Sequence, residues 1–143
     1  MPKFALNQIG GVIPAMVTPF KLDESLDEAG TRDCTRFLLD RGVNGLYLTG
    51  STGEAFLMDA AERKRVVEIV VDEVAGRVPV VAHVGAIGTR LSVDLARHAE
   101  AAGVDALSSV PPFYWQFNPD QIFGYYADIV AATSLPMIAY NIA

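Results

Sequence analysis

Two neighbouring hydroxyl side chains stand between glycines in the segment Gly50-Ser51-Thr52-Gly53-Glu54, directly after an apolar run. The hydroxyls and the backbone N–H groups of such a loop can surround a small anion, and a carboxylate suits them. A phosphate is disfavoured because the segment lacks the lysine and the longer glycine spacing of a P-loop. The same residues also fit a polar turn that satisfies its own backbone, so the residues alone leave both interpretations open.

Two tyrosines are candidates for proton transfer. Tyr140 closes an apolar run, where a core aromatic residue with a bonded hydroxyl explains it more simply, because a catalytic phenol needs a proton partner. Tyr114 lies in a stretch that also contains Phe113, Trp115 and Phe117. So many aromatic side chains in a loop indicate a subunit interface, which is compatible with a functional role for Tyr114.

Histidine and cysteine are too sparse for a metal centre. His83 lies inside an apolar run and is expected to be a core histidine, whereas His98 falls on a helical stretch and is expected to face solvent. Together with the single Cys34 they give no metal-ligand spacing, so we predict no metal site. One cysteine cannot form an internal disulfide, which fits a reducing compartment.

Short apolar runs alternate with amphipathic stretches, which predicts an α/β chain of the order βαβαβαβαβ. A capping box of Ser25 and Glu28 is expected to open the first helix, and Thr89 is expected to cap the third. We expect helices from Ser25 to Gly42, from Asp59 to Gly76, from Thr89 to Gly103 and from Asn118 onward, and strands at 11–18, 45–49, 79–84, 105–110 and 136–141.

Two architectures fit this order. A five-stranded doubly wound sheet of the flavodoxin type suits a chain of 143 residues and would make it a non-catalytic binding module. The first half of a (β/α)8 barrel suits a fifth strand with no covering helix after it, and is expected to place the strands in sequential order. In both architectures ligands bind at the C-terminal ends of the strands. That end is expected to carry Ser51, Thr52, His83, Tyr114 and Tyr140.

Composition and charge exclude several classes of protein. Hydrophobic residues make up 51% and charged residues 20%, which are globular proportions. The net charge of −6 disfavours nucleic acid as a partner, because an acidic surface repels phosphates. The sequence shows neither a signal segment nor an apolar run long enough for a bilayer. We therefore expect a single domain over residues 1–143, a cytoplasmic location and no membrane partner.

Five segments occur in a familiar order and spacing: 11–20, 50–54, 82–85, 112–114 and 140–142. Together they resemble the N-acetylneuraminate lyase and dihydrodipicolinate synthase family of class I pyruvate-dependent aldolases, over essentially the whole chain. His83-Val84-Gly85 and Pro112-Phe113-Tyr114 are more similar to the sialic acid lyases of that family. The synthases tend to have small residues at the first site and Tyr-Tyr-Asn at the second.

The resemblance implies a (β/α)8 TIM barrel, of which this chain would supply about the first four and a half βα units. It also implies a homotetrameric enzyme without a cofactor, which cleaves N-acetylneuraminate to N-acetylmannosamine and pyruvate through a Schiff base. Dihydrodipicolinate synthase or a related 2-keto-3-deoxy sugar acid aldolase is the alternative within the family. In either enzyme the partner is a small-molecule substrate.

The resemblance also implies roles for individual residues. Ser51 and Thr52 would hold the carboxylate of pyruvate, and Tyr140 would transfer a proton beside the Schiff base. Tyr114 would reach across a subunit interface and complete a hydroxyl relay from Ser51 or Thr52 to Tyr140 of the neighbour. A phenol with a pKa of about 10 is a weak base at neutral pH, so it needs such a relay or a substrate carboxylate.

The chain departs from the family in its lysines. The family's nucleophile is a lysine on the sixth strand, which is therefore expected beyond residue 143, and the chain alone is expected to be inactive. Lys3, Lys21 and Lys64 are the only lysines, and none is expected at the C-terminal end of a strand. Lys64 lies between Arg63 and Arg65 on a helical stretch whose cations we expect to face solvent.

Overall fold

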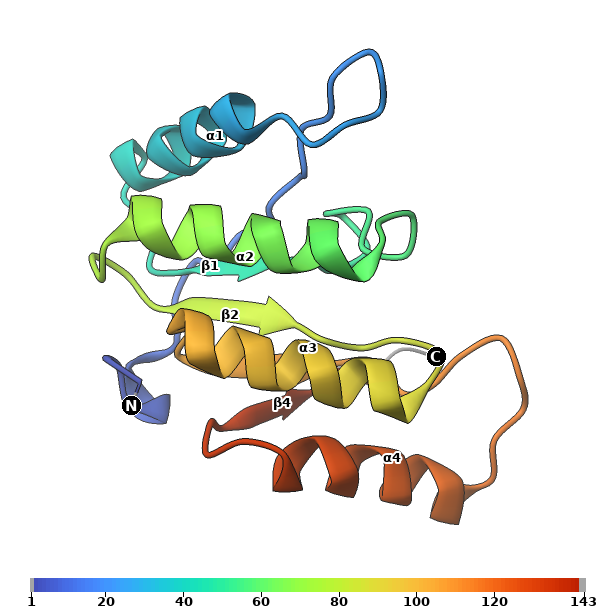
Figure 1. Cartoon of the computed structure of the whole chain (residues 1–143). Helices are drawn as coiled ribbons and strands as arrows, with labels where there is room; N and C mark the ends of the chain where they lie inside the picture. Colours follow the sequence, from blue (N-terminus) through green and yellow to red (C-terminus); the bar gives the residue numbers. More distant parts are fainter. Residues whose placement is uncertain (1, 142–143) are drawn as a thin grey trace.

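Four parallel strands form one sheet in the computed structural model, which describes residues 2–141 (Figure 1). The predicted segment 140–142 ends outside the described residues. The strands lie in sequential order, and each pairs with the next in parallel. Their bounds are β1 (Leu46–Leu48), β2 (Val80–His83), β3 (Ala106–Ser109) and β4 (Met137–Ala139).

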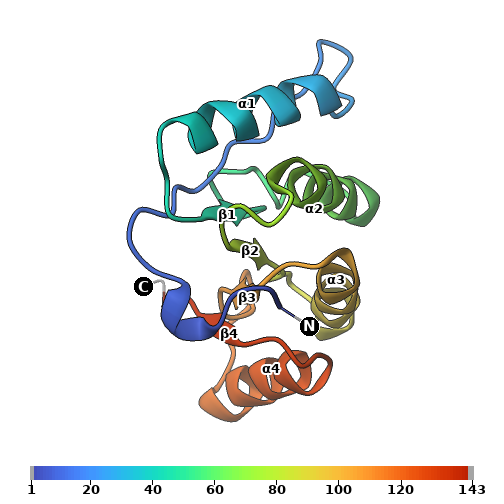
Figure 2. The ribbon, with the colours of Figure 1, turned by 90° about the vertical axis from the view of Figure 1, so that its left-hand side faces the viewer.

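Four helices alternate with these strands, as predicted, after a short 3-10 turn at Leu6–Gln8. Figure 2 shows the four α-helices as an outer arc around a sheet that bulges toward them, with the short 3-10 turn on the opposite side of the sheet. In the described part of the chain no helix is long and apolar enough to cross a membrane. The helix bounds are α1 (Glu28–Asp40), α2 (Ala60–Val74), α3 (Thr89–Ala102) and α4 (Pro119–Ala131).

Capping boxes begin α2 and α4 at the predicted residues. Asp59 accepts the backbone N–H of Glu62, while the Glu62 carboxylate accepts the N–H of Asp59. Asn118 and Gln121 form the same reciprocal pair at the start of α4. Each box satisfies two donors that the first helical turn leaves unpaired, which fixes where the helix starts.

Two predicted caps are wrong. Asp27, not Ser25, caps α1, because its carboxylate accepts a backbone N–H of the first turn, while the Ser25 hydroxyl donates to Asp23 at 2.7 Å. The N-cap of α3 is Gly88, and Thr89 is the first helical residue. In both cases the element exists as predicted and its start moves by one or two residues.

The strand predicted at 11–18 is wrong over most of its length. The segment lies beside β1 but forms a single parallel bridge, between Ala15 and Tyr47. Tyr47 donates its N–H to the Pro14 carbonyl at 3.0 Å, and Met16 donates to the Tyr47 carbonyl at 2.9 Å. Because Pro14 has no N–H, the segment cannot continue a regular ladder.

The strand order decides between the two architectures. Leu46 of β1 is in register with Val80 of β2, so the two strands pair directly. The flavodoxin order would insert the segment 11–18 between them, and that alternative is therefore wrong. The sequential order is that of consecutive βα units in a (β/α)8 barrel, as expected.

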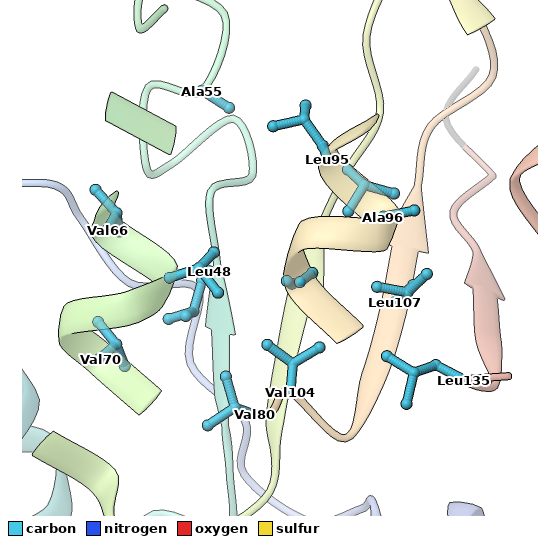
Figure 3. Close-up of a cluster of buried hydrophobic side chains, with 14 of the residues drawn as sticks. Leu48, Ala55, Val66, Val70, Val80, Leu95, Ala96, Val104, Leu107 and Leu135 are labelled. Carbon is cyan, nitrogen blue, oxygen red and sulfur yellow. The ribbon is translucent and has the colours of Figure 1, made fainter. Parts of the chain in front are cut away.

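Alternate residues of the strands point to opposite faces of the sheet, which separates a core from a site. Leu46, Leu48, Val80 and Leu107 belong to the buried cluster between the sheet and the helices. Figure 3 shows that cluster, with Leu48, Val80 and Leu107 from the strands and side chains of α2 and α3 around them. The residues in between point to the concave face and include Tyr47, His83 and Ser108.

The exposed edges of this sheet predict self-association of the 143-residue chain. Among the described residues β4 pairs only with β3, and Val12, Val17 and Ile138 remain exposed near the two edges. Unpaired apolar edges template further pairing, and burial contributes about 25 cal/mol per Å². Sedimentation velocity is expected to find a dimer or a larger particle. A folded monomer that binds no hydrophobic dye would contradict this expectation.

Candidate functional site

A cavity of about 330 Å³ opens at the C-terminal ends of the strands. Three of the predicted site residues meet there: Ser51 and Thr52 from the loop after β1, and Tyr140 directly after β4. The side chain of Tyr140 is half exposed. The cavity is lined by Ile13, Ala15, Tyr47, Gly50, Ser51, Thr52, His83, Val110 and Tyr140.

The loop after β1 contributes Ser51 and Thr52 to the lining of this cavity. Its backbone turns sharply, because Thr49 and Glu54 adopt left-handed conformations with φ of 52° and 57°. The Glu54 N–H donates to the Ser51 carbonyl at 3.0 Å and closes the loop. Within residues 2–141 the hydroxyls of Ser51 and Thr52 have no hydrogen-bond partner, so they are available to a ligand. The alternative of a turn in which these hydroxyls satisfy the backbone is not supported.

Gly53 seats the loop against the extended segment before α1. A Cβ at this position would lie 2.9 Å from the Met16 carbonyl oxygen, a backbone atom that cannot move aside cheaply. The Thr18 hydroxyl donates to the Gly53 carbonyl at 2.7 Å, and Thr18 is buried. The predicted first strand therefore serves the site as a support, although it is not a strand.

Tyr47 is a polar residue of the cavity that sequence analysis assigned only to a strand. Its hydroxyl donates to the Ser108 hydroxyl at 3.1 Å, which donates in turn to the Ile138 carbonyl at 3.1 Å. Burial raises the pKa of Tyr47 above its ordinary value, so the phenol stays protonated at neutral pH. Side chains alternate along a strand, and Leu46 and Leu48 face the core. This alternation is the sequence signal that could have placed Tyr47 on the side of the cavity.

His83 is a buried histidine, as predicted, and it also lines the cavity. Its Nδ1 lies 3.0 Å from the Thr49 carbonyl oxygen, and the Val110 N–H donates to its Nε2 at 3.2 Å. Burial, together with the charge of Arg63, lowers the pKa of His83 to about 4 despite the bond to Thr49. The ring is therefore neutral at pH 7 and cannot serve as a base while both nitrogens are bonded.

Arg63 does not face solvent, which corrects the expectation from the charged stretch of α2. Only 4% of it is exposed, and its guanidinium donates to the carbonyls of His83 at 2.9 Å and Gly85 at 3.1 Å. Burial lowers its pKa to about 10. The spacing to the buried Val66 and Val70 places Arg63 on the sheet-facing side of α2, and this was the missed signal.

The lysines lie away from the cavity. Lys64 pairs with Asp94 at 2.7 Å on the outer surface. Lys21 lines a separate, largely acidic cavity formed by the loop before α1, the loop after β1 and the start of α2. The backbone N–H of Lys3 donates to the carboxylate of Asp105, which lies in the turn between α3 and β3. No lysine among residues 2–141 lines the cavity that holds Ser51.

His98 is partly buried rather than solvent-facing, because its Nε2 lies 2.9 Å from a carboxylate oxygen of Glu68. In the described part of the chain no group of three or more His, Cys, Asp or Glu side chains could hold a metal ion. His98 therefore links α3 to α2, and it is not among the residues that line the cavity with Ser51.

Tyr114 does not line the cavity. It lies on the loop between β3 and α4, is 81% exposed and has a φ of 77°. The rings of Tyr114 and Trp115 are perpendicular, with 4.9 Å between their centroids. The rings of Phe113 and Phe56 pack together with 4.5 Å between their centroids. A single copy of the chain thus brings together Ser51, Thr52 and Tyr140 but not Tyr114.

A Gly53→Ala substitution tests how tightly the loop is seated. The added Cβ forces the loop away from the Met16 carbonyl, so unfolding in urea should show a loss of about 1–3 kcal/mol. Gly124→Ala is the matched control, because a Cβ there meets no atom within 4 Å in helix α4 and should stabilise by about 0.5–1 kcal/mol. Equal effects of the two substitutions would show that the loop is not held against this segment.

Residues 8–143 match the dihydrodipicolinate synthetase family. The N-acetylneuraminate lyase of Citrobacter koseri is 45% identical over 137 residues, which are 95% of this chain and 46% of that protein. A catalytic lysine mutant of the Ruminococcus gnavus sialic acid aldolase superposes with a TM-score of 0.93 at 35% identity, over 99% of this chain and 46% of that one.

A prophage protein of the dihydrodipicolinic acid synthase family from Escherichia coli K12, solved with pyruvate, superposes with a TM-score of 0.92 at 34% identity. The alignment covers 96% of this chain and 46% of that protein. The chain thus spans about half the length of the relatives it matches, and its four strands and four helices correspond to the N-terminal part of their barrel. On its own sequence and fold, this chain belongs to the dihydrodipicolinate synthetase family.

Proposed function

We propose that this chain carries the pyruvate-binding part of a Schiff-base aldolase that cleaves N-acetylneuraminate to N-acetylmannosamine and pyruvate. The cavity that brings Ser51, Thr52 and Tyr140 together is the observation that carries the proposal. The curated relatives at 42–45% identity are named N-acetylneuraminate lyase, which favours that enzyme over dihydrodipicolinate synthase.

Ser51 and Thr52 bind the carboxylate of the keto acid. Two unpaired hydroxyls on one short loop can donate to the two oxygens of a carboxylate, and the left-handed turn at Thr49 aims the loop at the cavity. Such charge-assisted hydrogen bonds are about twice as strong as those between neutral groups. They fix the keto acid with its carbonyl carbon toward the centre of the barrel.

Tyr140 moves the proton. Its phenol borders the same cavity from the end of β4, and a phenol is a weak base that needs a proton partner to act in catalysis. The nucleophile is a lysine beyond residue 143, whose amine replaces the ketone oxygen of the keto acid and releases water. When the carbon–carbon bond breaks, the proton of the sugar hydroxyl leaves through Tyr140 as the aldehyde forms.

Tyr114 completes the relay from a neighbouring subunit. The loop after β3 exposes Tyr114 and Trp115, and Phe123 is exposed on α4. Aromatic side chains gathered on a surface are typical of an interface between subunits. In the proposed homotetramer, each site therefore receives Tyr114 from a neighbouring copy of the chain. The single, partly buried Cys34 suits the reducing cytoplasm proposed for the enzyme.

Borohydride trapping tests the missing nucleophile. The 143-residue chain, incubated with pyruvate and reduced, should show no pyruvyl adduct by mass spectrometry, because Lys3, Lys21 and Lys64 lie away from the cavity. Joined to the C-terminal half of the Citrobacter koseri relative, it should trap on a lysine after residue 143. Ser51→Ala should lower the trapping yield of that longer protein. An adduct on Lys21 or Lys64 would contradict the assignment.

The relay role of Tyr114 is tested in the same longer, assembled protein. Tyr114→Phe keeps the ring but removes the hydroxyl, so kcat should fall by about 100-fold or more with little change in KM. Trp115→Phe is the control, since Trp115 is a neighbour on the same exposed loop with no proposed part in the relay. Unchanged turnover in the Tyr114→Phe variant would remove the relay.

A further inference from the structure

The ring of His83 joins the C-terminal ends of three strands. His83 is the last residue of β2, Thr49 follows β1 directly and Val110 follows β3 directly. The ring reaches the Thr49 carbonyl with Nδ1 at 3.0 Å and the Val110 N–H with Nε2 at 3.2 Å. One side chain therefore sets the spacing of three strand ends at the rim of the cavity.

The two partners fix the protonation of this ring. The Thr49 carbonyl can only accept, so Nδ1 carries the proton, and the Val110 N–H can only donate, so Nε2 keeps its lone pair. A proton on Nε2 would break the bond to Val110 and place a second cation beside Arg63. Burial and that neighbouring charge hold the pKa of His83 near 4, so the neutral form persists at pH 7.

Thr49 and His83 form a second hydrogen bond in the opposite direction. The Thr49 hydroxyl donates to the His83 carbonyl at 2.9 Å, and the same carbonyl accepts the guanidinium of Arg63 at 2.9 Å. Gly85 lets the ring sit in place, because a Cβ there would lie 2.7 Å from Nε2 of His83. His83 is thus fixed through both its backbone and its ring, and it holds Thr49 from two directions.

Thr49 is where the carboxylate-binding loop begins. It adopts a left-handed φ of 52°, which a β-branched residue rarely does, and the next three residues are Gly50, Ser51 and Thr52. Such a conformation persists only where surrounding contacts impose it. The bond from the His83 ring to the Thr49 carbonyl and the bond from the Thr49 hydroxyl to the His83 carbonyl are two such contacts.

We propose that His83 is a positioning residue, whose Nδ1–H bond to the Thr49 carbonyl holds Ser51 and Thr52 in the orientation that receives the carboxylate of a 2-keto acid. The inference rests on the proposed function for the identity of the ligand. The contribution of His83 to the orientation of the loop needs no ligand, so it can be measured in the free protein.

Two substitutions separate the two ring bonds. In His83→Asn the amide N–H stands where Nδ1 stood and can donate to Thr49, but nothing accepts from Val110. In His83→Gln the amide oxygen stands where Nε2 stood and can accept from Val110, but the bond to Thr49 is lost. His98→Gln is the matched control, because within residues 2–141 the ring of His98 hydrogen-bonds only Glu68 on α2.

Amide NMR spectra of the 143-residue chain give the first measurement. The signals of Ser51 and Thr52 should keep their wild-type positions in His83→Asn and in His98→Gln, and they should move in His83→Gln. Titration with pyruvate gives the second, with a Kd about tenfold weaker in His83→Gln and within about twofold of wild type in His83→Asn. Unmoved loop signals in His83→Gln would overturn the positioning role.

Ring-nitrogen spectra of the wild-type chain test the proposal without any substitution. They should show the proton on Nδ1 and no titration of His83 over about pH 5–8, where a free histidine titrates. A proton on Nε2 would overturn the proposal. If pyruvate leaves the wild-type Ser51 and Thr52 signals unmoved, the carboxylate assignment fails, while the ring spectra and the loop signals still decide the role of His83.

Discussion

Parallel pairing of consecutive strands is the constraint on which this site depends. Every strand ends at the same edge of the sheet, so Ser51 and Tyr140, almost ninety residues apart, border one cavity. The four α-helices cover only the outer face of the sheet (Figure 2), which leaves its concave face to the cavity. Because side chains alternate along a strand, the same short segments supply an apolar core to the helices and Tyr47, His83 and Ser108 to the cavity.

Buried polar groups on this scaffold are tied to backbone atoms of the strand ends. Arg63 and Thr49 both donate to the His83 carbonyl, and Asp105 accepts the N–H of Val80 at the opposite ends of the strands. A buried donor or acceptor without a partner costs about 1–3 kcal/mol, so such contacts permit few alternative arrangements. Among the side-chain nitrogen and oxygen atoms of the described residues, only Nε of Arg63 is both buried and unpaired. The rim of the cavity is therefore held by specific polar contacts rather than by apolar packing alone.

Much of the fold is predictable from local signals, and the errors have identifiable causes. Capping boxes define the starts of α2 and α4. They are predictable because the two residues of each reciprocal pair lie within four consecutive positions of the sequence. The start of α1 is ambiguous because Ser25 and Asp27 are both good caps, and only the contact of Ser25 with Asp23 decides between them. The segment 11–18 is apolar enough for a strand, but the missing N–H of Pro14 limits its ladder.

The site is less predictable than the fold. The rule that ligands bind at strand ends and the family resemblance found Ser51, Thr52 and Tyr140. Arg63 was misplaced because a run of cations suggests a solvated face, whereas its spacing to Val66 and Val70 shows the buried side. The part played by His83 depends on contacts with Thr49 and Val110 that lie 34 and 27 residues away, which no local pattern contains.

The most direct test is a crystal structure of the pyruvate adduct, trapped in this chain joined to the lysine-bearing half of a relative's barrel. The pyruvyl carboxylate is expected within about 2.6–3.2 Å of the Ser51 and Thr52 hydroxyls, with the Tyr140 phenol beside the adduct. A carboxylate bound elsewhere, for example beside Lys21, with Ser51 and Thr52 empty, would contradict this expectation.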